Sequence, residues 1–156
     1  MKRLLLIPIT FLLFSTTVLA QANFTGYLVD AEDKKLKNVT INLYQGNDAV
    51  STKVWSKKFD YTLKLETYYT LELVKDGFVS KRIAISTFQG DKGAEPFLFV
   101  MELIAKDDAV EGVDEDYPSA LIKYKKNEGG FNFDVKYAKN TKKEENEAKK
   151  KKTEGN

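Results

Sequence analysis

The chain has 156 residues, with 25 Lys and Arg, 23 Asp and Glu, and neither Cys nor His. The two missing residue types exclude disulfide scaffolds, Cys nucleophiles, His general bases and Cys/His zinc sites. Aromatic residues make up 12% of the chain, a share that suits a packed domain rather than a wholly disordered protein. The length allows one domain, with or without an appendage.

Residues 1–22 have the pattern of a secretory signal peptide. Lys2 and Arg3 form a positive start, residues 4–14 form an apolar run, and small residues follow it. Cleavage after Ala22 fits the A-x-A pattern, and cleavage after Ala20 fits nearly as well. The apolar run is too short for a membrane anchor, because a span needs roughly 20 apolar residues. The lack of Cys excludes a lipoprotein. We therefore expect an exported protein, periplasmic or secreted, without a transmembrane span in its mature form.

Removal of the signal peptide leaves equal numbers of basic and acidic residues, and these are segregated along the chain. Residues 139–156 contain seven Lys and four Glu. The preceding body is therefore net acidic, and the tail is net basic.

Residues 23–104 are expected to form a β-sandwich domain. Apolar and polar residues alternate with a period of two in short runs, and Gly, Asp and Asn mark turns between the runs. Seven strands are predicted, at 24–30, 38–44, 50–55, 59–65, 69–74, 79–86 and 97–103. Short strands at about ten-residue spacing, most of them with one charged face, predict an all-β, antiparallel, immunoglobulin-like sandwich.

The remainder of the chain is expected to form three further segments. Residues 105–116 contain six acids and indicate a linker. Residues 117–138 form a short apolar extension, in which the alternation from Phe131 to Tyr137 suggests a strand, although 134–148 fits a charged helix equally well. Residues 139–156 contain a single small apolar residue, so they are expected to be a disordered tail or a solvated helix.

The segment 24–104 resembles the carboxypeptidase regulatory-like and Cna-B-like family of prealbumin-type sandwiches. The matching pieces are Gly26–Asp30, Leu36–Ile41, Phe59–Leu65 and Tyr69–Phe78, and the last contains the pattern Tyr-x-Leu-x-Leu-x-Lys-x-Gly-Phe. The whole chain looks like small exported proteins of the Bacteroidetes group. The resemblance implies folding, spacing or recognition modules without catalytic activity. Some Cna-B-like domains form a Lys–Asn isopeptide bond from a Lys in the first strand, but 24–30 contain none.

Catalysis in this chain would have to use carboxylates, Tyr, Ser or Lys. The strand pattern instead turns Asp60 and Glu72 toward solvent, so we expect no catalytic residues and no enzyme. The acidic run 107–116 lacks the spacing of an EF-hand, and neither a metal site nor a cofactor is predicted. The Lys run 149–152 is interpreted as a solvated surface, with weak attraction to envelope polyanions as the alternative.

Aromatic residues cluster between positions 55 and 69. Alternation places Phe59, Tyr61 and Tyr69 in the core and leaves Trp55 and Tyr68 as candidate recognition residues. The sequence thus predicts an exported interaction or structural module of the bacterial envelope. The alternative is a module that binds carbohydrate or peptide through exposed aromatics. Candidate partners are an envelope protein or a glycan and not nucleic acid, and the oligomeric state stays open.

Overall fold

The computed structural model describes residues 21–90, 93, 95–109, 117–141, 143 and 147. Its strands are β1 (Gln21–Val29), β2 (Val39–Gln45), β3 (Asp48–Trp55), β4 (Phe59–Lys64), β5 (Tyr68–Val74), β6 (Lys81–Ser86), β7 (Phe97–Glu102), β8 (Ala120–Lys125) and β9 (Gly130–Phe133). A 3₁₀ turn covers Lys106–Asp108, and residues 135–141 are helical. Residues 1–20 of the predicted signal peptide 1–22 and most of the predicted tail lie outside the described residues, whereas Gln21 and Ala22 belong to β1.

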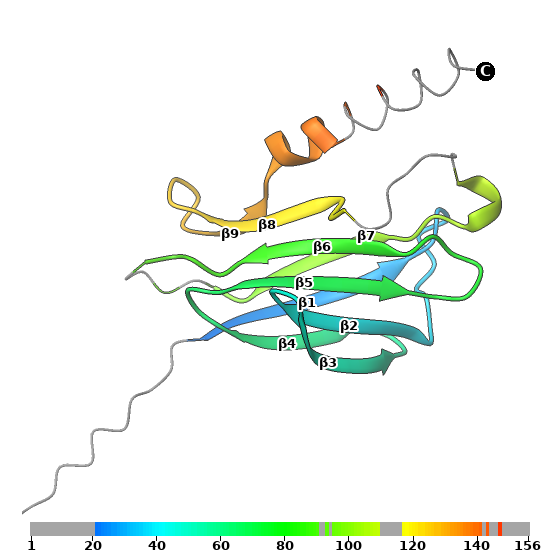
Figure 1. The fold of residues 1–156 in the computed structure, drawn as a ribbon, viewed down its shortest axis with the longest axis horizontal. Helices are drawn as coiled ribbons and strands as arrows, with labels where there is room; N and C mark the ends of the chain where they lie inside the picture. Colours follow the sequence, from blue (N-terminus) through cyan, green and yellow to red (C-terminus); the bar gives the residue numbers. More distant parts are fainter. Residues whose placement is uncertain are drawn as a thin grey trace, which may run out of the picture.

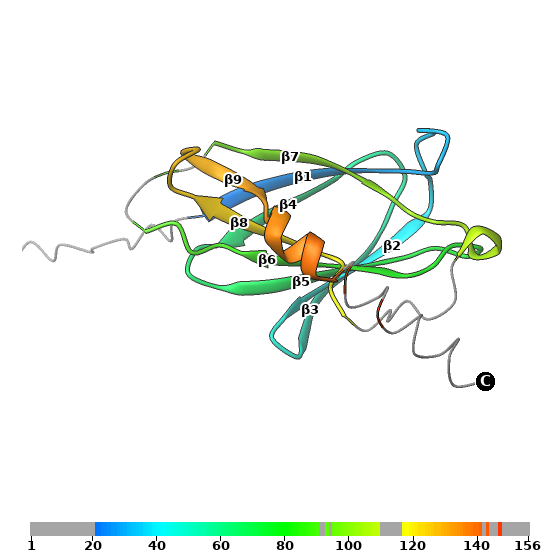
Figure 2. The same ribbon diagram turned by 90° about the horizontal axis from the view of Figure 1, so that it is seen from above.

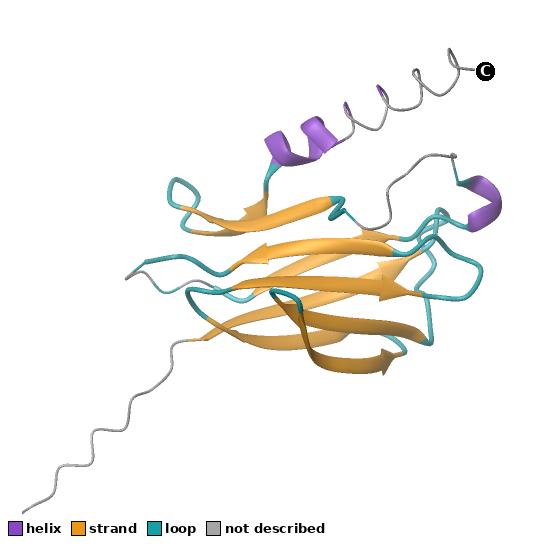
Figure 3. Cartoon of the chain, viewed as in Figure 1, coloured by secondary structure: helices purple, strands orange, loops and turns teal. Residues whose placement is uncertain are grey.

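The strands form two sheets that pack face to face. The smaller sheet has the order β4-β1-β7, and the larger has the order β3-β2-β5-β6-β8-β9. Figure 1 shows the larger sheet in front of the smaller one, Figure 2 shows the two layers after a turn of 90°, and Figure 3 shows how little helix accompanies them. The predicted all-β sandwich is confirmed. The alternation that predicted it appears as buried inner faces, for example in β4, where every second residue is buried.

The predicted number of strands was wrong, because nine occur among the described residues rather than seven. The additional strands, β8 and β9, come from residues 117–138, for which the sequence predicts a short apolar extension. There, β8 pairs with β6, and β9 pairs with β8. Residues 130–133 form a strand and 135–141 a helix, so each of the two alternatives for this segment describes one part of it.

The prediction that all strands are antiparallel was also wrong. β1 pairs with β7 in parallel, and β6 pairs with β8 in parallel. In both pairs the chain forms at least one strand of the other sheet before it returns. The second strand of the pair then runs in the same direction as the first. Alternation within a strand reports which face is buried, and it carries no information on the direction of the neighbour.

A glycine of the smaller sheet provides space for a buried ring. Gly26 of β1 lies opposite Phe59 of β4, and Phe59 is only 1% exposed. A Cβ atom at position 26 would lie 2.1 Å from Cζ of the Phe59 ring. The ring therefore covers the glycine backbone, an arrangement that aromatic residues use to protect strand glycines.

Aromatic rings also connect the two sheets. Phe24 of β1 packs against Phe131 of β9 with ring centroids 4.9 Å apart. Phe133 of β9 contacts Phe97 and Phe99 of β7, each at 6.0 Å. Such tilted and edge-on pairs are favourable beyond the area they bury. The last strand of the larger sheet is thus packed against the smaller sheet.

Substitution of Gly26 by Ala tests the contact with Phe59. We expect Gly26→Ala to lower the free energy of unfolding by about 2–3 kcal/mol, because the new methyl group must displace a buried ring. Gly130→Ala is the matched control, since a Cβ atom at that strand glycine meets nothing within 4 Å. Urea unfolding measures both. Equal stabilities of the two variants would contradict the packing described here.

Truncation of Phe131 tests whether β9 belongs to the sandwich. We expect Phe131→Ala to cost about 3–5 kcal/mol, as for other buried aromatic residues. Val135→Ala, at an exposed position just beyond β9, should have little effect in the same urea titration. A Phe131→Ala variant as stable as the wild type would show that 117–138 does not contribute to the core.

Candidate functional site

The outer face of the larger sheet carries a row of polar side chains across four neighbouring strands. Asn42 of β2 lies opposite Thr52 of β3 on one side and Glu72 of β5 on the other, and Glu72 lies opposite Arg82 of β6. Directly opposite residues in antiparallel strands point to the same face. The register therefore brings these four side chains together, although 40 residues separate Asn42 from Arg82 in the sequence.

Glu72 is the centre of this row. Its carboxylate accepts hydrogen bonds from Asn42 Nδ2 at 2.9 Å and Tyr44 Oη at 3.0 Å. Arg82 donates from Nε at 3.1 Å and from Nη2 at 2.8 Å. Burial by itself would raise the pKa of Glu72, but the hydrogen bonds from Asn42, Arg82 and Tyr44 and the positive charge of Arg82 outweigh it and lower the pKa. Glu72 is therefore a charged acceptor that orients three neighbours.

Tyr44 is fixed in its protonated form by the same contact. The hydrogen bond that it donates to Glu72 is the largest cause of a raised Tyr44 pKa, and burial and the charge of Glu72 add to it. Thr52 Oγ1 donates to Asn42 Oδ1 at 2.9 Å, which fixes the orientation of the Asn42 amide. The row is thus a connected network in which each side chain has a defined rotamer.

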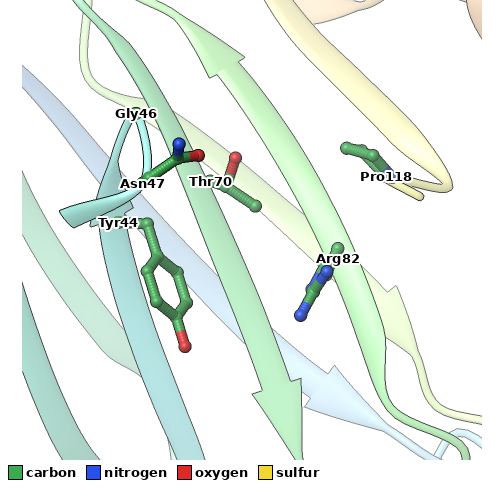
Figure 4. A pocket seen from close by; sticks show the side chains of 6 residues that line it. All are labelled: Tyr44, Gly46, Asn47, Thr70, Arg82 and Pro118. Atoms are coloured by element: carbon green, nitrogen blue, oxygen red, sulfur yellow. The ribbon is translucent and has the colours of Figure 1, made fainter. Parts of the chain in front are cut away.

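A hollow of about 310 Å³ lies beside this network. It is lined by Tyr44, Gly46, Asn47, Thr70, Arg82 and Pro118. Figure 4 shows Tyr44 and Arg82 on the two sides of Thr70, with Pro118 beyond Arg82. Thr70 lies opposite Tyr44 on one side and Ala84 on the other. Among the lining residues, the short side chain of Thr70 lies between the longer side chains of Tyr44 and Arg82.

The Pro118 wall of the hollow is held from two directions. Ser119 donates from its backbone N–H to the Arg82 carbonyl at 2.9 Å. Tyr137 Oη donates to the Pro118 carbonyl at 2.8 Å. Tyr137 belongs to the helical segment 135–141, which begins after Asp134, and Asp134 accepts the backbone N–H of Lys136 at 3.0 Å as a helix cap. The helix therefore supports one wall of the hollow.

Trp55 lies at the end of β3 and faces inward. It lies opposite buried Val39, and its ring is packed near Phe59 at 6.4 Å and Tyr61 at 6.1 Å. The ammonium of Lys53 lies 5.7 Å from the ring centroid. A cavity beside Trp55 has a volume of only about 10 Å³, which is room for about one water molecule. The contacts of Trp55 are therefore mainly with the protein itself.

Tyr68 lies at the start of β5 and faces outward, where its side chain is 66% exposed. Its ring packs at a tilt against the exposed ring of Phe88, with the centroids 4.8 Å apart. β2 lies between β3 and β5. Trp55 of β3 pairs with Val39, the first residue of β2, whereas Tyr68 of β5 lies just beyond the partner of Gln45, the last residue of β2. Trp55 and Tyr68 thus lie at opposite ends and on opposite faces of the sheet. They do not form one site, and a recognition role for either stays a prediction.

The remaining predictions about chemistry concern acidic residues. Asp60 is exposed and accepts a hydrogen bond from Thr25, which is the main cause of its lowered pKa. Asp107 and Asp108 lie in the 3₁₀ turn, and 110–116 lie outside the described residues. Among the residues that the structure describes, no three acidic side chains gather as metal ligands would. In the same part of the chain, no helix is long and apolar enough to cross a membrane.

The sequence alone does not single out Tyr44, Thr70 or Arg82. Each occupies an outward position in its strand, where polar residues are usual and give no separate signal. One feature of the sequence does point to the site. Tyr44, Glu72 and Arg82 occupy outward positions on three predicted strands, and their side chains can hydrogen bond to one another. The pairing register is needed to show that they meet.

Comparisons with known proteins give no family for this chain. No family model and no curated protein matches it. Among similar solved structures, chlorocatechol 1,2-dioxygenase from Pseudomonas putida has 8% identity and a TM-score of 0.39, over 59% of this chain and 63% of the other. Catechol 1,2-dioxygenase from Acinetobacter sp. ADP1, inhibited by bound mercury, has 11% identity and a TM-score of 0.43, over 67% and 59%. The match thus spans less than two thirds of either dioxygenase chain.

The expectation that the chain is not an enzyme is withdrawn as a correction, since the two solved structures named above are enzymes. The alternating strand pattern and the lack of His and Cys were a weak basis for that expectation, because carboxylates and Tyr can also act in acid–base or nucleophilic catalysis. At these TM-scores the likeness assigns no reaction, metal or substrate to this chain.

The charge of Glu72 can be tested through the dependence of stability on pH. Because the pKa of Glu72 is lower in the folded state, its ionised form stabilises the fold. This contribution is complete above the pKa of the unfolded state, about 4.3, and it is lost as the pH falls through the pKa of the folded state. We expect Glu72→Gln to cost about 1–2 kcal/mol at neutral pH, because it weakens charge-assisted hydrogen bonds.

The measurement is urea unfolding at pH 7, 5, 4 and 3. Between pH 5 and pH 3 the wild type should lose more stability than Glu72→Gln, so the two curves converge. Glu102→Gln, at an exposed position of β7, is the control and should follow the wild type. Parallel curves for Glu72→Gln and wild type would contradict the network.

Proposed function

We propose that this protein is an exported interaction module of the bacterial envelope that binds a short saccharide in the hollow beside Glu72. The observation that carries the proposal is the hollow itself, with its volume of about 310 Å³ and its lining of Tyr44, Asn47, Thr70 and Arg82. That volume is at the lower end of the range for small-ligand sites. The signal-peptide pattern of residues 1–22 supports export.

The chemistry of the lining favours a sugar. The Tyr44 ring offers an apolar face for the C–H groups of a pyranose, while Asn47 and Thr70 offer both donors and acceptors for hydroxyl groups. Arg82 adds a guanidinium group whose Nε and Nη2 are held by Glu72. Because Glu72 fixes Tyr44 and Arg82 before a ligand arrives, little side-chain entropy would be lost on binding.

The resemblance of 24–104 to carboxypeptidase regulatory-like and Cna-B-like domains agrees with a recognition role. In this proposal the aromatic residue that contacts the sugar is Tyr44 instead of Trp55 or Tyr68. An envelope protein is the competing partner, and its contact would extend beyond the hollow to a larger area.

A thermal-shift screen with cell-wall and lipopolysaccharide oligosaccharides tests the proposal. We expect one glycan class to raise the melting temperature of the wild type. Tyr44→Ala and Asn47→Ala should weaken that binding at least about tenfold, a loss of roughly 1.4 kcal/mol. Asn47 lies in the exposed β2–β3 turn, so its substitution should leave the fold intact.

Tyr68→Ala is the matched aromatic control and should bind as the wild type does. Loss of binding in Tyr68→Ala but not in Tyr44→Ala would move the site to the Tyr68–Phe88 pair. Absence of any stabilising glycan across the panel would contradict the proposed ligand class.

A further inference from the structure

The structure distinguishes the two signal-peptide cleavage positions that the sequence allows. Gln21 and Ala22 are the first two residues of β1, where they lie opposite Lys64 and Leu63 of β4. Ala22 is 4% exposed and belongs to the buried core, whereas Gln21 is exposed. Cleavage after Ala22 would remove both residues from the strand, and cleavage after Ala20 would keep the strand whole.

Loss of residues 21 and 22 would affect the core directly. Leu63 is 2% exposed in the structure and lies opposite Ala22, so a chain beginning at Asn23 would expose it and shorten the pairing between β1 and β4. The next pair, Asn23 and Thr62, is joined by a hydrogen bond of 2.9 Å between their side chains. The pairing between β1 and β4 therefore includes Gln21 and Ala22.

On this basis we propose that the mature protein begins at Gln21 and that Gln21 is then modified to pyroglutamate. The proposal rests on the proposed export, because it requires that a signal peptidase removes residues 1–20. It adds a covalent modification site at the start of β1 and defines the true N-terminus of the sandwich.

The chemistry requires no oxidant and no second reactant. The free α-amine of Gln21 attacks Cδ of its own carboxamide, the bond from Cδ to Nε2 breaks, and ammonia leaves with a proton from the amine. A five-membered lactam forms, and the mass falls by about 17 Da. Gln21 is exposed, so its amine and side chain are accessible for this reaction.

The charge at this end of the sheet favours the cyclised form. A free α-amine has a pKa of about 7.7–8.0 and is largely protonated at neutral pH. It would place a positive charge on the residue directly opposite Lys64, and like charges in opposite positions destabilise a strand pair. The lactam is neutral and removes this repulsion. It also leaves no free amine for an aminopeptidase that would shorten β1.

The experiment expresses the full chain in a bacterium that exports it, isolates the mature protein and measures its intact mass. A tryptic digest then gives the mass of the N-terminal peptide, which should cover residues 21–34 and be about 17 Da lighter than unmodified sequence. The digest separates this change from an isopeptide bond, which would lose the same mass at another place. Gln21→Asn is the matched control, because its shorter side chain cannot close the five-membered ring.

The outcomes are distinct. A mature chain of 21–156 with a blocked N-terminus, and a Gln21→Asn chain of full mass, are the expected results. A mature chain that begins at Asn23, or one that begins at Gln21 with a free amine after prolonged incubation, would overturn the proposal while leaving export intact. A chain that keeps residues 1–20 in the cell would instead refute export itself.

Discussion

The contact between Phe24 and Phe131 is the packing interaction on which the rest of the sandwich depends. Phe24 lies in the first strand and Phe131 in the last, and their ring centroids are 4.9 Å apart. This contact joins the two sheets and places β9 against the smaller sheet. Through the pairing of β9 with β8 and of β8 with β6, it also fixes the position of the segment that carries Pro118.

The inner face of the larger sheet therefore packs the core, and its outer face carries the polar network. The inner face is apolar and contacts the aromatic rings of the smaller sheet. The outer face carries the hydrogen-bonded row around Glu72, and the hollow beside it is bounded by strands that are distant in sequence. Because the backbone is fixed by the core, the outward side chains of Tyr44, Thr70 and Arg82 keep a defined arrangement without contributing to the core themselves.

The sequence was sufficient for the elements that depend on local alternation. It predicted the all-β fold, and it placed Phe59, Tyr61 and Tyr69 in the core, where all three are buried. It did not reveal the parallel pairs or the role of β8 and β9, because these depend on where the chain returns after crossing to the other sheet. The hollow was missed for the same reason: Tyr44 and Arg82 meet only through the register of three strands. Trp55 and Tyr68 were grouped as neighbours in sequence, whereas the register separates them.

The central claim is that the outer face of the larger sheet is the binding surface, with Tyr44 and Arg82 at its centre. A titration of the isotope-labelled protein with the stabilising oligosaccharide, followed by amide chemical shifts in NMR spectra, tests it most directly. The account predicts that the largest shifts gather at Tyr44, Asn47, Thr70 and Arg82 and that the amides of Trp55 and Tyr68 change little. Shifts that instead gather around Trp55 or Tyr68, or that are absent at saturating ligand, would contradict it.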